Sequence, residues 1–184
     1  MDKNNKIYIG IDPGLMGGIV ALMPERKMLE IHETPLAVNS ETKKKDFNVN
    51  AFIEIMRRYD NMKEKIIVYI ENQLAIPDQS VKATAKTFFN LGLMKGVCSG
   101  LNFEIFMINP KAWQAVFFPH GNTKQKSYQV ACDLYPSCKQ RFTGKRGGIK
   151  DGLTDACLIA EYGKWHYNHP IHSAMRKSRV KSND

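Results

Sequence analysis

The stretch Ile9-Gly10-Ile11-Asp12-Pro13-Gly14 decides how the rest of the chain is interpreted. It closes the segment Ile7–Asp12, whose apolar, β-branched and aromatic residues predict a strand. Pro13-Gly14 is a strong turn signal, so Asp12 comes at the carboxyl end of that strand. Two further strands are expected after short turns, at Ile19–Met23 and Met28–Thr34. Three strands joined in this way predict an antiparallel meander.

Strand and helix patterns alternate in the rest of the chain. The run Ile66–Ile70 is continuously apolar and lies in a predicted strand, Lys65–Glu71, as is typical of a buried parallel strand. A fifth strand is expected at Glu104–Ile108. Helices are predicted at 47–59, 80–101, 110–117, 123–134 and 151–165, with a polar linker at 39–46 and a basic loop at 136–150. We assign residues 1–167 to one domain and 168–184 to a basic tail that we expect to be flexible.

The predicted helix over 80–101 carries Gly92, Gly96 and Gly100 at intervals of four residues. Each glycine weakens a helix by about 1 kcal/mol relative to alanine, so a stripe of three indicates close packing against another backbone. Two interpretations stay open here. The stripe packs either on the protein's own sheet or against a second copy of the chain.

The composition excludes several classes of protein. With 184 residues, 43% of them hydrophobic and 24% charged, the chain can bury a core without disulfides or structural metals. No apolar run approaches the roughly 18 residues of a membrane span, and the polar start Met1–Lys6 is unlike a signal peptide. The four cysteines include no CxxC pair and are expected to be free thiols.

The net charge of +9 is distributed unevenly. Residues 1–104 carry +1, residues 105–150 carry +7, residues 151–163 carry −3 and residues 164–184 carry +4. Basic charge gathered around a small acidic island favours a polyanion, chiefly nucleic acid, as the partner. The alternative is a solvated basic face.

Four carboxylates stand where a buried acid is unusual. Asp12 and Glu71 end two predicted strands, and Asp151 and Asp155 share one face of the last helix. Bringing several carboxylates together is costly unless a cation neutralises them. Two Mg²⁺ or Mn²⁺ ions about 4 Å apart would do so, and could hold the attacking and leaving oxygens of a phosphodiester displacement. We therefore expect all four residues to be catalytic metal ligands.

Each of these acids also has a simpler explanation when it is taken alone. An aspartate before Pro-Gly often forms a turn, so Asp12 needs no metal. Asp151 could cap the last helix, and Asp155 could interact with its dipole. The metal interpretation depends on the combination of two strand ends with one helix terminus in a basic chain.

Four motifs occur in the order found in the RuvC-like Holliday junction resolvases. They are Ile9-Gly-Ile-Asp-Pro-Gly14, Tyr69-Ile-Glu71, Leu93-Met-Lys-Gly-Val97 and Lys150-Asp-Gly-Leu-Thr-Asp-Ala156. The chain resembles that family over roughly residues 6–163. The segments Asn109–Trp113, Thr123–Ser127 and Leu134–Pro136 look like those of its phage-type and small bacterial members.

The resemblance implies an α/β, RNase H-like fold with a mixed five-stranded sheet and helices on both faces. It also implies a homodimer that makes paired nicks across four-way DNA junctions, with two Mg²⁺ or Mn²⁺ ions in each active site. Asp12, Glu71 and Asp155 match the family's catalytic carboxylates. Bacterial RuvC usually has its penultimate aspartate where this chain has Gly152, and Asp151 takes that role as in phage and mitochondrial relatives.

Other residues near the motifs receive weaker assignments. Leu74 stands where several bacterial members have an aromatic residue that wedges the junction. Trp113 is expected to pack in a half-buried position rather than to stack on DNA. His120 is assigned to a loop rather than to catalysis. Four phenylalanines are assigned to the core: Phe88, Phe89, Phe117 and Phe118.

Phosphate contacts are expected from the segment that carries +7. The candidates are Lys111, Lys124, Lys126, Lys145, Arg146 and Lys150. Because phosphate contacts carry little sequence information, selectivity for a junction is expected to come from DNA shape and dimer geometry.

The predicted function is therefore resolution of Holliday junctions by a metal-dependent, structure-selective endodeoxyribonuclease. The enzymatic alternatives are a broader branched-DNA endonuclease and a YqgF-like RNA-processing nuclease. The non-enzymatic alternative is a catalytically silent junction-binding protein, against which the intact acidic set argues. The expected location is the cytoplasm, or the host cytoplasm if the source is viral as the phage-type motifs suggest, with no membrane partner.

Overall fold

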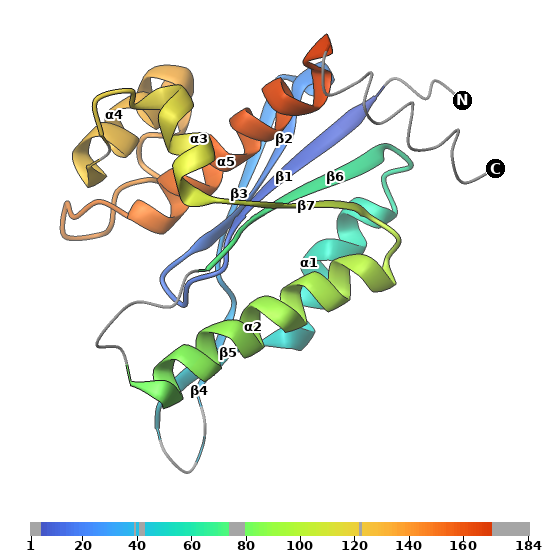
Figure 1. The fold of residues 1–184 in the computed structure, drawn as a ribbon, viewed down its shortest axis with the longest axis vertical. Coiled ribbons are helices and arrows are strands. Elements are labelled where there is room, and N and C mark those ends of the chain that lie inside the picture. Colours follow the sequence, from blue (N-terminus) through green and yellow to red (C-terminus); the bar gives the residue numbers. More distant parts are fainter. Residues whose placement is uncertain (1–4, 39, 41–42, 74–79, 122, 171–184) are drawn as a thin grey trace.

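The computed structural model describes residues 5–38, 40, 43–73, 80–121 and 123–170. Within these residues, five strands form one sheet in the order β3-β2-β1-β6-β7 (Figure 1). The antiparallel meander consists of β1 (Lys6–Asp12), β2 (Gly18–Met23) and β3 (Met28–Glu33). The parallel part adds β6 (Lys65–Glu71) beside β1 and β7 (Glu104–Ile108) beside β6. The predicted mixed sheet is confirmed.

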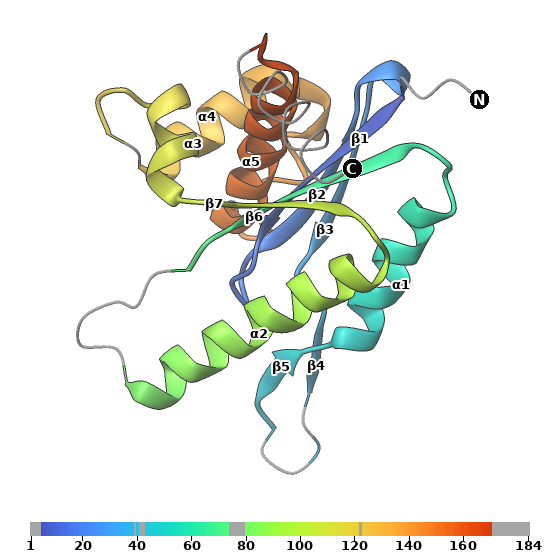
Figure 2. The same cartoon turned by 45° about the vertical axis from the view of Figure 1, so that its right-hand side comes forward.

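Helices cover both faces of the sheet, as predicted (Figures 1 and 2). One face carries α1 (Val49–Asp60) and α2 (Val81–Gly100). The opposite face carries α3 (Pro110–Phe117), α4 (Lys124–Leu134) and α5 (Asp151–Asn168), of which α5 continues three residues beyond its predicted end. Single 3-10 turns lie at Pro24–Arg26 and Pro136–Cys138.

Strand alternation determines which side chains face which helices. In β1, Ile7, Ile9 and Ile11 belong to the core under α1 and α2, whereas Tyr8 belongs to the core under α5. Because successive side chains point to opposite faces, Asp12 shares the α5 side with Tyr8.

The same alternation holds in β6. There Val68 and Ile70 face α1 and α2, whereas Ile67 and Tyr69 face α5. Glu71, two residues after Tyr69, therefore lies on the α5 side. The two strand-end acids thus share one face of the sheet.

Glycine at position 10 allows α5 to lie directly on β1. A Cβ added at Gly10 would be 2.2 Å from the carbonyl oxygen of Ala156 and 2.4 Å from the backbone nitrogen of Ala160. No side chain larger than hydrogen fits that gap, so the motif around Asp12 needs glycine for packing. The close contact brings the start of α5 near the carboxyl end of β1.

The segment expected to be a polar linker contains part of a second, small sheet. Leu36–Val38 (β4) and Lys45–Phe47 (β5) pair in antiparallel register and project below the main sheet (Figure 2). The prediction was wrong because a strand of three residues is too short to display an alternating pattern. An ion pair of 3.2 Å between Asp46 and Lys86 connects this β4–β5 ribbon to α2.

The glycine stripe of α2 faces away from the sheet. A Cβ added at Gly92, Gly96 or Gly100 would meet no atom of the described residues within 4 Å. Packing on the protein's own sheet is therefore excluded as its explanation. The core side of α2 is instead formed by buried residues that include Leu91, Met94 and Cys98.

The core assignment of the phenylalanines is only half right. Phe118 is buried and Phe117 packs against the core. Phe88 and Phe89 are 42% and 66% exposed, so their assignment to the core was wrong. The reason is that both lie outside the face of α2 that contacts the sheet.

Two expectations about the chain's chemistry can be compared with the structure. All four cysteines lie in the described part of the chain and are free thiols, as predicted. Within the described ranges, no helix is both long enough and apolar enough to span a membrane.

Candidate active site

Neighbouring strand ends bring Asp12 and Glu71 together. β1 and β6 run parallel and side by side, with Ile11 paired to Ile70, so the next residue of each strand is an acid. Both acids face α5. The backbone N–H of Gly14 donates a hydrogen bond of 3.0 Å to Asp12 Oδ1, so the turn after β1 holds this carboxylate.

The first two turns of α5 carry the other two acids. Asp151 is its first residue and Asp155 follows four residues later, on the same side of the helix. Gly152 packs against the loop after β1: an added Cβ would lie 2.2 Å from the carbonyl oxygen of Met16 and 2.4 Å from the Cα of Gly17. An aspartate at position 152 would therefore collide with that loop.

The acids share one electrostatic environment. Burial, opposed by the hydrogen bond from Trp113 and reinforced by the charges of Asp12 and Asp155, raises the pKa of Glu71 to about 7. Burial likewise raises the pKa of Asp155 to about 6, with contributions from Asp12 and Asp151. The pKa of Asp12 is raised first by burial and then by Asp151. All four predicted carboxylates are thus close enough to interact electrostatically, and together they are called the carboxylate cluster.

Three neighbouring side chains hold the carboxylates in place. The indole of Trp113 is fully buried, and its Nε1–H donates a hydrogen bond of 2.8 Å to Glu71 Oε1. Ser127 is also buried and hydrogen bonds to Asp155, which partly offsets the rise in the pKa of that acid. Lys124 forms an ion pair of 2.6 Å with Asp151, and this contact raises the pKa of the lysine.

Sequence reasoning missed the roles of Trp113 and Ser127. Trp113 packs against the core as predicted, but it is fully buried rather than half-buried, and it also donates a hydrogen bond to Glu71. A signal was available: β7 lies beside β6, with Ile108 paired to Glu71, so the helix that begins at Pro110 must start next to this acid. The role of Ser127 had no comparable signal, because it depends on how α4 packs on α5.

The predicted phosphate-binding cations divide into two groups. Lys124 forms an ion pair of 2.6 Å with Asp151 of the carboxylate cluster, whereas the ammonium of Lys150, next to Asp151 in the sequence, forms an ion pair of 2.6 Å with Glu33. The remaining four are exposed elsewhere on α3, on α4 or in the loop before α5: Lys111, Lys126, Lys145 and Arg146. Lys124 is therefore the best placed of the six to contact a phosphate near the acids.

Two further assignments concern an exposed loop histidine and residues outside the described part of the chain. His120 is exposed in the loop after α3, as expected for a loop histidine. Leu74 and the basic residues Arg176–Lys181 lie outside the described residues, so their assignments stay predictions.

The donor set fits a hard divalent cation. Asp155 Oδ1 is buried and finds no hydrogen-bond partner among the described residues, which is costly for a carboxylate oxygen unless a cation approaches it. All four donors are carboxylates, as Mg²⁺ and Mn²⁺ prefer. Within the described ranges, however, no three acidic, histidine or cysteine side chains already form a group that could hold a metal. The cluster is open, and its side chains would have to draw together around an ion.

Comparison with known protein families gives no match, and neither does comparison with curated proteins. Among solved structures, Thermus thermophilus RuvC in complex with a Holliday junction substrate is similar with a TM-score of 0.54, at 15% identity, over 84% of this chain and 90% of that one. A second Thermus thermophilus RuvC structure gives 0.53 at 15% identity, with the same coverage. The yeast mitochondrial Holliday junction resolvase Ydc2 gives 0.47 at 13% identity, over 83% and 75% of the two chains.

The sheet order and the helices on both faces define an α/β fold of the RNase H-like class. Within that class the chain has the fold of Thermus thermophilus RuvC, which is the fold that the motif resemblance implies.

Proposed function

We propose that this protein is a metal-dependent, structure-selective endodeoxyribonuclease that resolves four-way DNA junctions by paired hydrolysis of phosphodiester bonds. The observation that carries the proposal is the convergence of Asp12, Glu71, Asp151 and Asp155 at one edge of the sheet. Support comes from the fold, which is that of a RuvC whose solved structure holds a Holliday junction substrate.

The carboxylate cluster is the proposed binding site for two Mg²⁺ or Mn²⁺ ions. The ligands would be Asp12, Glu71, Asp151 and Asp155, and the buried, unpartnered oxygen of Asp155 supports this assignment. Bound ions would neutralise charge on the scissile phosphate and lower the pKa of the attacking water. The high pKa of Glu71 and Asp155 indicates that the site favours either protons or cations over bare negative charge.

The protein's own hydrogen bonds orient the ligands before substrate arrives. Gly14 N–H holds Asp12, the Trp113 indole holds Glu71, and the Ser127 hydroxyl approaches Asp155. Such outer contacts restrict the rotation of a ligand and are as much a part of a metal site as the ligands. Because the donors of these hydrogen bonds are neutral groups, the negative charge of the carboxylates stays available to bind cations.

Lys124 is proposed to exchange its partner Asp151 for a DNA phosphate when a metal ion and DNA bind. Its side chain is 77% exposed and its ammonium lies 2.6 Å from Asp151 Oδ2, where it neutralises one acid of the cluster. When a cation takes over that task, the ammonium is released toward the solvent side, where a phosphate of the DNA would lie. An ammonium group on a flexible stem suits such a transfer.

The exposed face of α2 is the proposed dimer interface. Paired nicks in a symmetric junction require two active sites related by symmetry. Phe88 and Phe89 are exposed there, and the glycine backbone at positions 92, 96 and 100 is open to close approach. Exposed aromatic side chains beside a bare helix backbone are typical of a surface that a partner covers.

Cleavage of matched substrates tests the function. Four-way, three-way, flap and duplex DNA and a single-stranded RNA are incubated with the protein and Mg²⁺, and both nicks are mapped. Symmetric paired nicks on the four-way junction, abolished in Asp155→Asn but with junction binding retained, support the proposal. Equal cutting of every branched DNA would support the broader nuclease, and cutting of RNA alone would overturn the assignment to DNA.

A further inference from the structure

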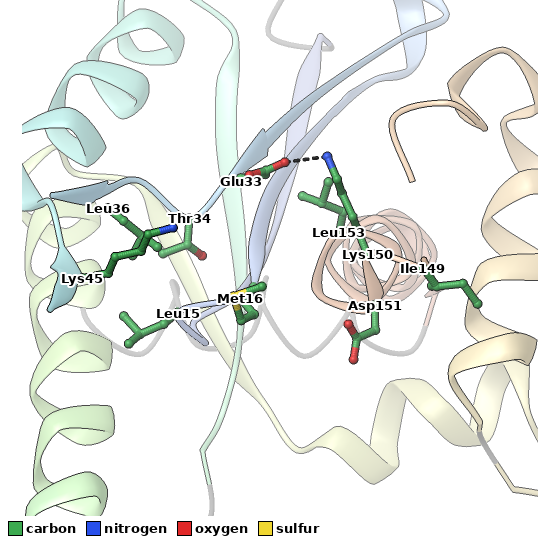
Figure 3. Close-up of a pocket in the computed structure, with 11 residues that line it drawn as sticks. Leu15, Met16, Glu33, Thr34, Leu36, Lys45, Ile149, Lys150, Asp151 and Leu153 are labelled. Atoms are coloured by element: carbon green, nitrogen blue, oxygen red, sulfur yellow. Dashed lines mark hydrogen bonds and ion pairs between the residues drawn. The ribbon is translucent and has the colours of Figure 1, made fainter. Parts of the chain in front are cut away.

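A pocket adjoins the carboxylate cluster on the side of the β4–β5 ribbon (Figure 3). It lies between the loop after β1, the ends of β3 and of the ribbon, and the first turn of α5, and its volume is about 190 Å³. Asp151 belongs to both the pocket and the cluster. A ligand in the pocket would therefore lie directly beside a phosphate held at the acids.

The inner walls of the pocket are apolar. Leu15 and Met16 come from the loop after β1, Leu36 from β4 and Leu153 from α5. The Met16 side chain is 84% exposed, an unusual position for so long an apolar group. A thioether on a flexible stem packs well against the edge or face of an aromatic ring. The volume is below the range of sites for drug-sized ligands and suits a single flat ring system.

Charged groups stand at the rim rather than in the apolar wall. Lys45 of β5 and Lys150 before α5 both line the pocket, and Lys150 is paired with Glu33 across it (Figure 3). A ligand with an apolar ring and a flanking phosphate would match this division, because the ring meets the leucines while the phosphate meets the lysines. A free phosphate would not match the pocket, since it would contact mainly aliphatic carbon atoms in the walls.

We propose that this pocket is a nucleobase subsite, which receives the base of a nucleotide next to the scissile phosphate. The inference rests on the proposed function, because a strand held over the carboxylates would bring its neighbouring nucleotide to Asp151. Successive nucleotides rise only about 3.4 Å along a strand, so such a base is within reach of the pocket. Bases at a junction leave the stack more cheaply than bases inside a duplex.

Fluorescence of a base analogue tests occupancy of the pocket without cleavage. The probe is a four-way junction with a single 2-aminopurine, moved one nucleotide at a time along both sides of the crossover, and titrated with protein in Ca²⁺. At one position the emission is expected to change on binding. Met16→Ala and Leu36→Ala should lose most of that change. The matched control is Val38→Ala, on the same strand as Leu36, 62% exposed and not part of the pocket lining.

Cleavage of abasic junctions in Mg²⁺ gives a second readout. Stacking of a base is worth enough that its removal at the responsive position should slow wild-type cleavage about 10-fold. Met16→Ala should lose little further rate on the same abasic junction, because no base remains there to enter the pocket.

The two hypotheses fail in different ways. A wild-type protein that cuts the junction, but responds to abasic sites and to 2-aminopurine in the same way as Met16→Ala, would overturn the subsite and leave the function standing. A protein that binds the junction without cutting it would overturn the proposed function, and the fluorescence titration would still show whether a base enters the pocket.

Discussion

The buried indole of Trp113 donates a hydrogen bond of 2.8 Å to Glu71, one of the four acids of the carboxylate cluster. The topology produces this contact, since α3 begins where β7 ends, and β7 is the neighbour of the strand that carries Glu71. This hydrogen bond uses only one of the two carboxylate oxygens of Glu71, Oε1. Trp113 is thus a positioning residue that orients the carboxylate.

Trp113→Phe should therefore weaken the metal site while preserving the aromatic packing. Removing a hydrogen bond that orients a metal ligand typically costs about 10- to 100-fold in metal affinity or activity. We expect a decrease of that size in Mn²⁺ affinity, measured by calorimetry, and in single-turnover cleavage. Trp165→Phe is the matched control, because that indole is 47% exposed on α5. Unchanged Mn²⁺ affinity in Trp113→Phe would show that the indole serves packing alone.

The raised pKa values of the cluster predict that the metal-free protein loses stability as the pH rises. Glu71 and Asp155 hold protons more tightly in the folded state, with pKa values of about 7 and about 6, than in the unfolded chain. Their favourable contribution is complete below about pH 4 and is lost as the pH rises through 6 and 7. Above about pH 7, each ionised acid lowers the free energy of unfolding of the metal-free protein by on the order of 2–3 kcal/mol.

Thermal unfolding at pH 5 and pH 8 measures this effect. In EDTA, the wild type should melt at a lower temperature at pH 8, and Glu71→Gln and Asp155→Asn should raise its melting temperature at that pH. Addition of Mg²⁺ should stabilise the wild type at pH 8 and have little effect on either variant. A wild type whose stability is independent of pH in EDTA would contradict the proposed electrostatics.

The contact between Gly152 and the loop after β1 predicts that this glycine cannot be replaced. A methyl group at position 152 would lie 2.2 Å from the Met16 carbonyl oxygen, so Gly152→Ala should cost about 1–3 kcal/mol of stability and displace the acids of α5. Gly148→Ala is the control, because a Cβ there meets no described atom within 4 Å. Urea unfolding and cleavage rates measure both effects. Moving the acid, with Asp151→Asn and Gly152→Asp together, should fail to restore cleavage.

The strands, the helices and the positions of the four acids could be predicted from local patterns, and the RNase H-like fold from the resemblance of four motifs to a known family. The apolar run before Glu71 and the Pro-Gly turn after Asp12 mark strand ends, and adjacent parallel strands place their ends at one edge. Contacts that depend on tertiary packing are not marked by any such pattern in the sequence. Ser127 reaches Asp155 only because α4 lies on α5, and Phe89 is exposed although its apolar character alone suggests burial.

The ion pair between Lys124 and Asp151 predicts opposite effects on metal and on DNA. Lys124→Met should bind Mg²⁺ more tightly in the absence of DNA, because the ammonium no longer competes for Asp151. It should bind the junction more weakly, and the slope of its salt dependence should fall by about 0.9, because one phosphate is no longer neutralised. Lys63→Met is the matched control, because Lys63 is exposed just before β6, at the opposite end of that strand from Glu71. Weaker Mg²⁺ binding in Lys124→Met would contradict the exchange of partners.

The exposed face of α2 predicts a dimer that depends on Phe89. Phe89→Ser removes a side chain that is 66% exposed in the single chain, so it should scarcely change the stability of the fold. In a dimer that covers this face, it should raise the dissociation constant, as measured by sedimentation equilibrium. It should also separate the two nicks in time, because the sites would no longer act together on one junction. Val116→Ser is the matched control, because Val116 is 44% exposed on α3, on the opposite face of the sheet. A wild type that sediments as a monomer, or a Phe89→Ser variant that dimerises equally well, would rule out this interface.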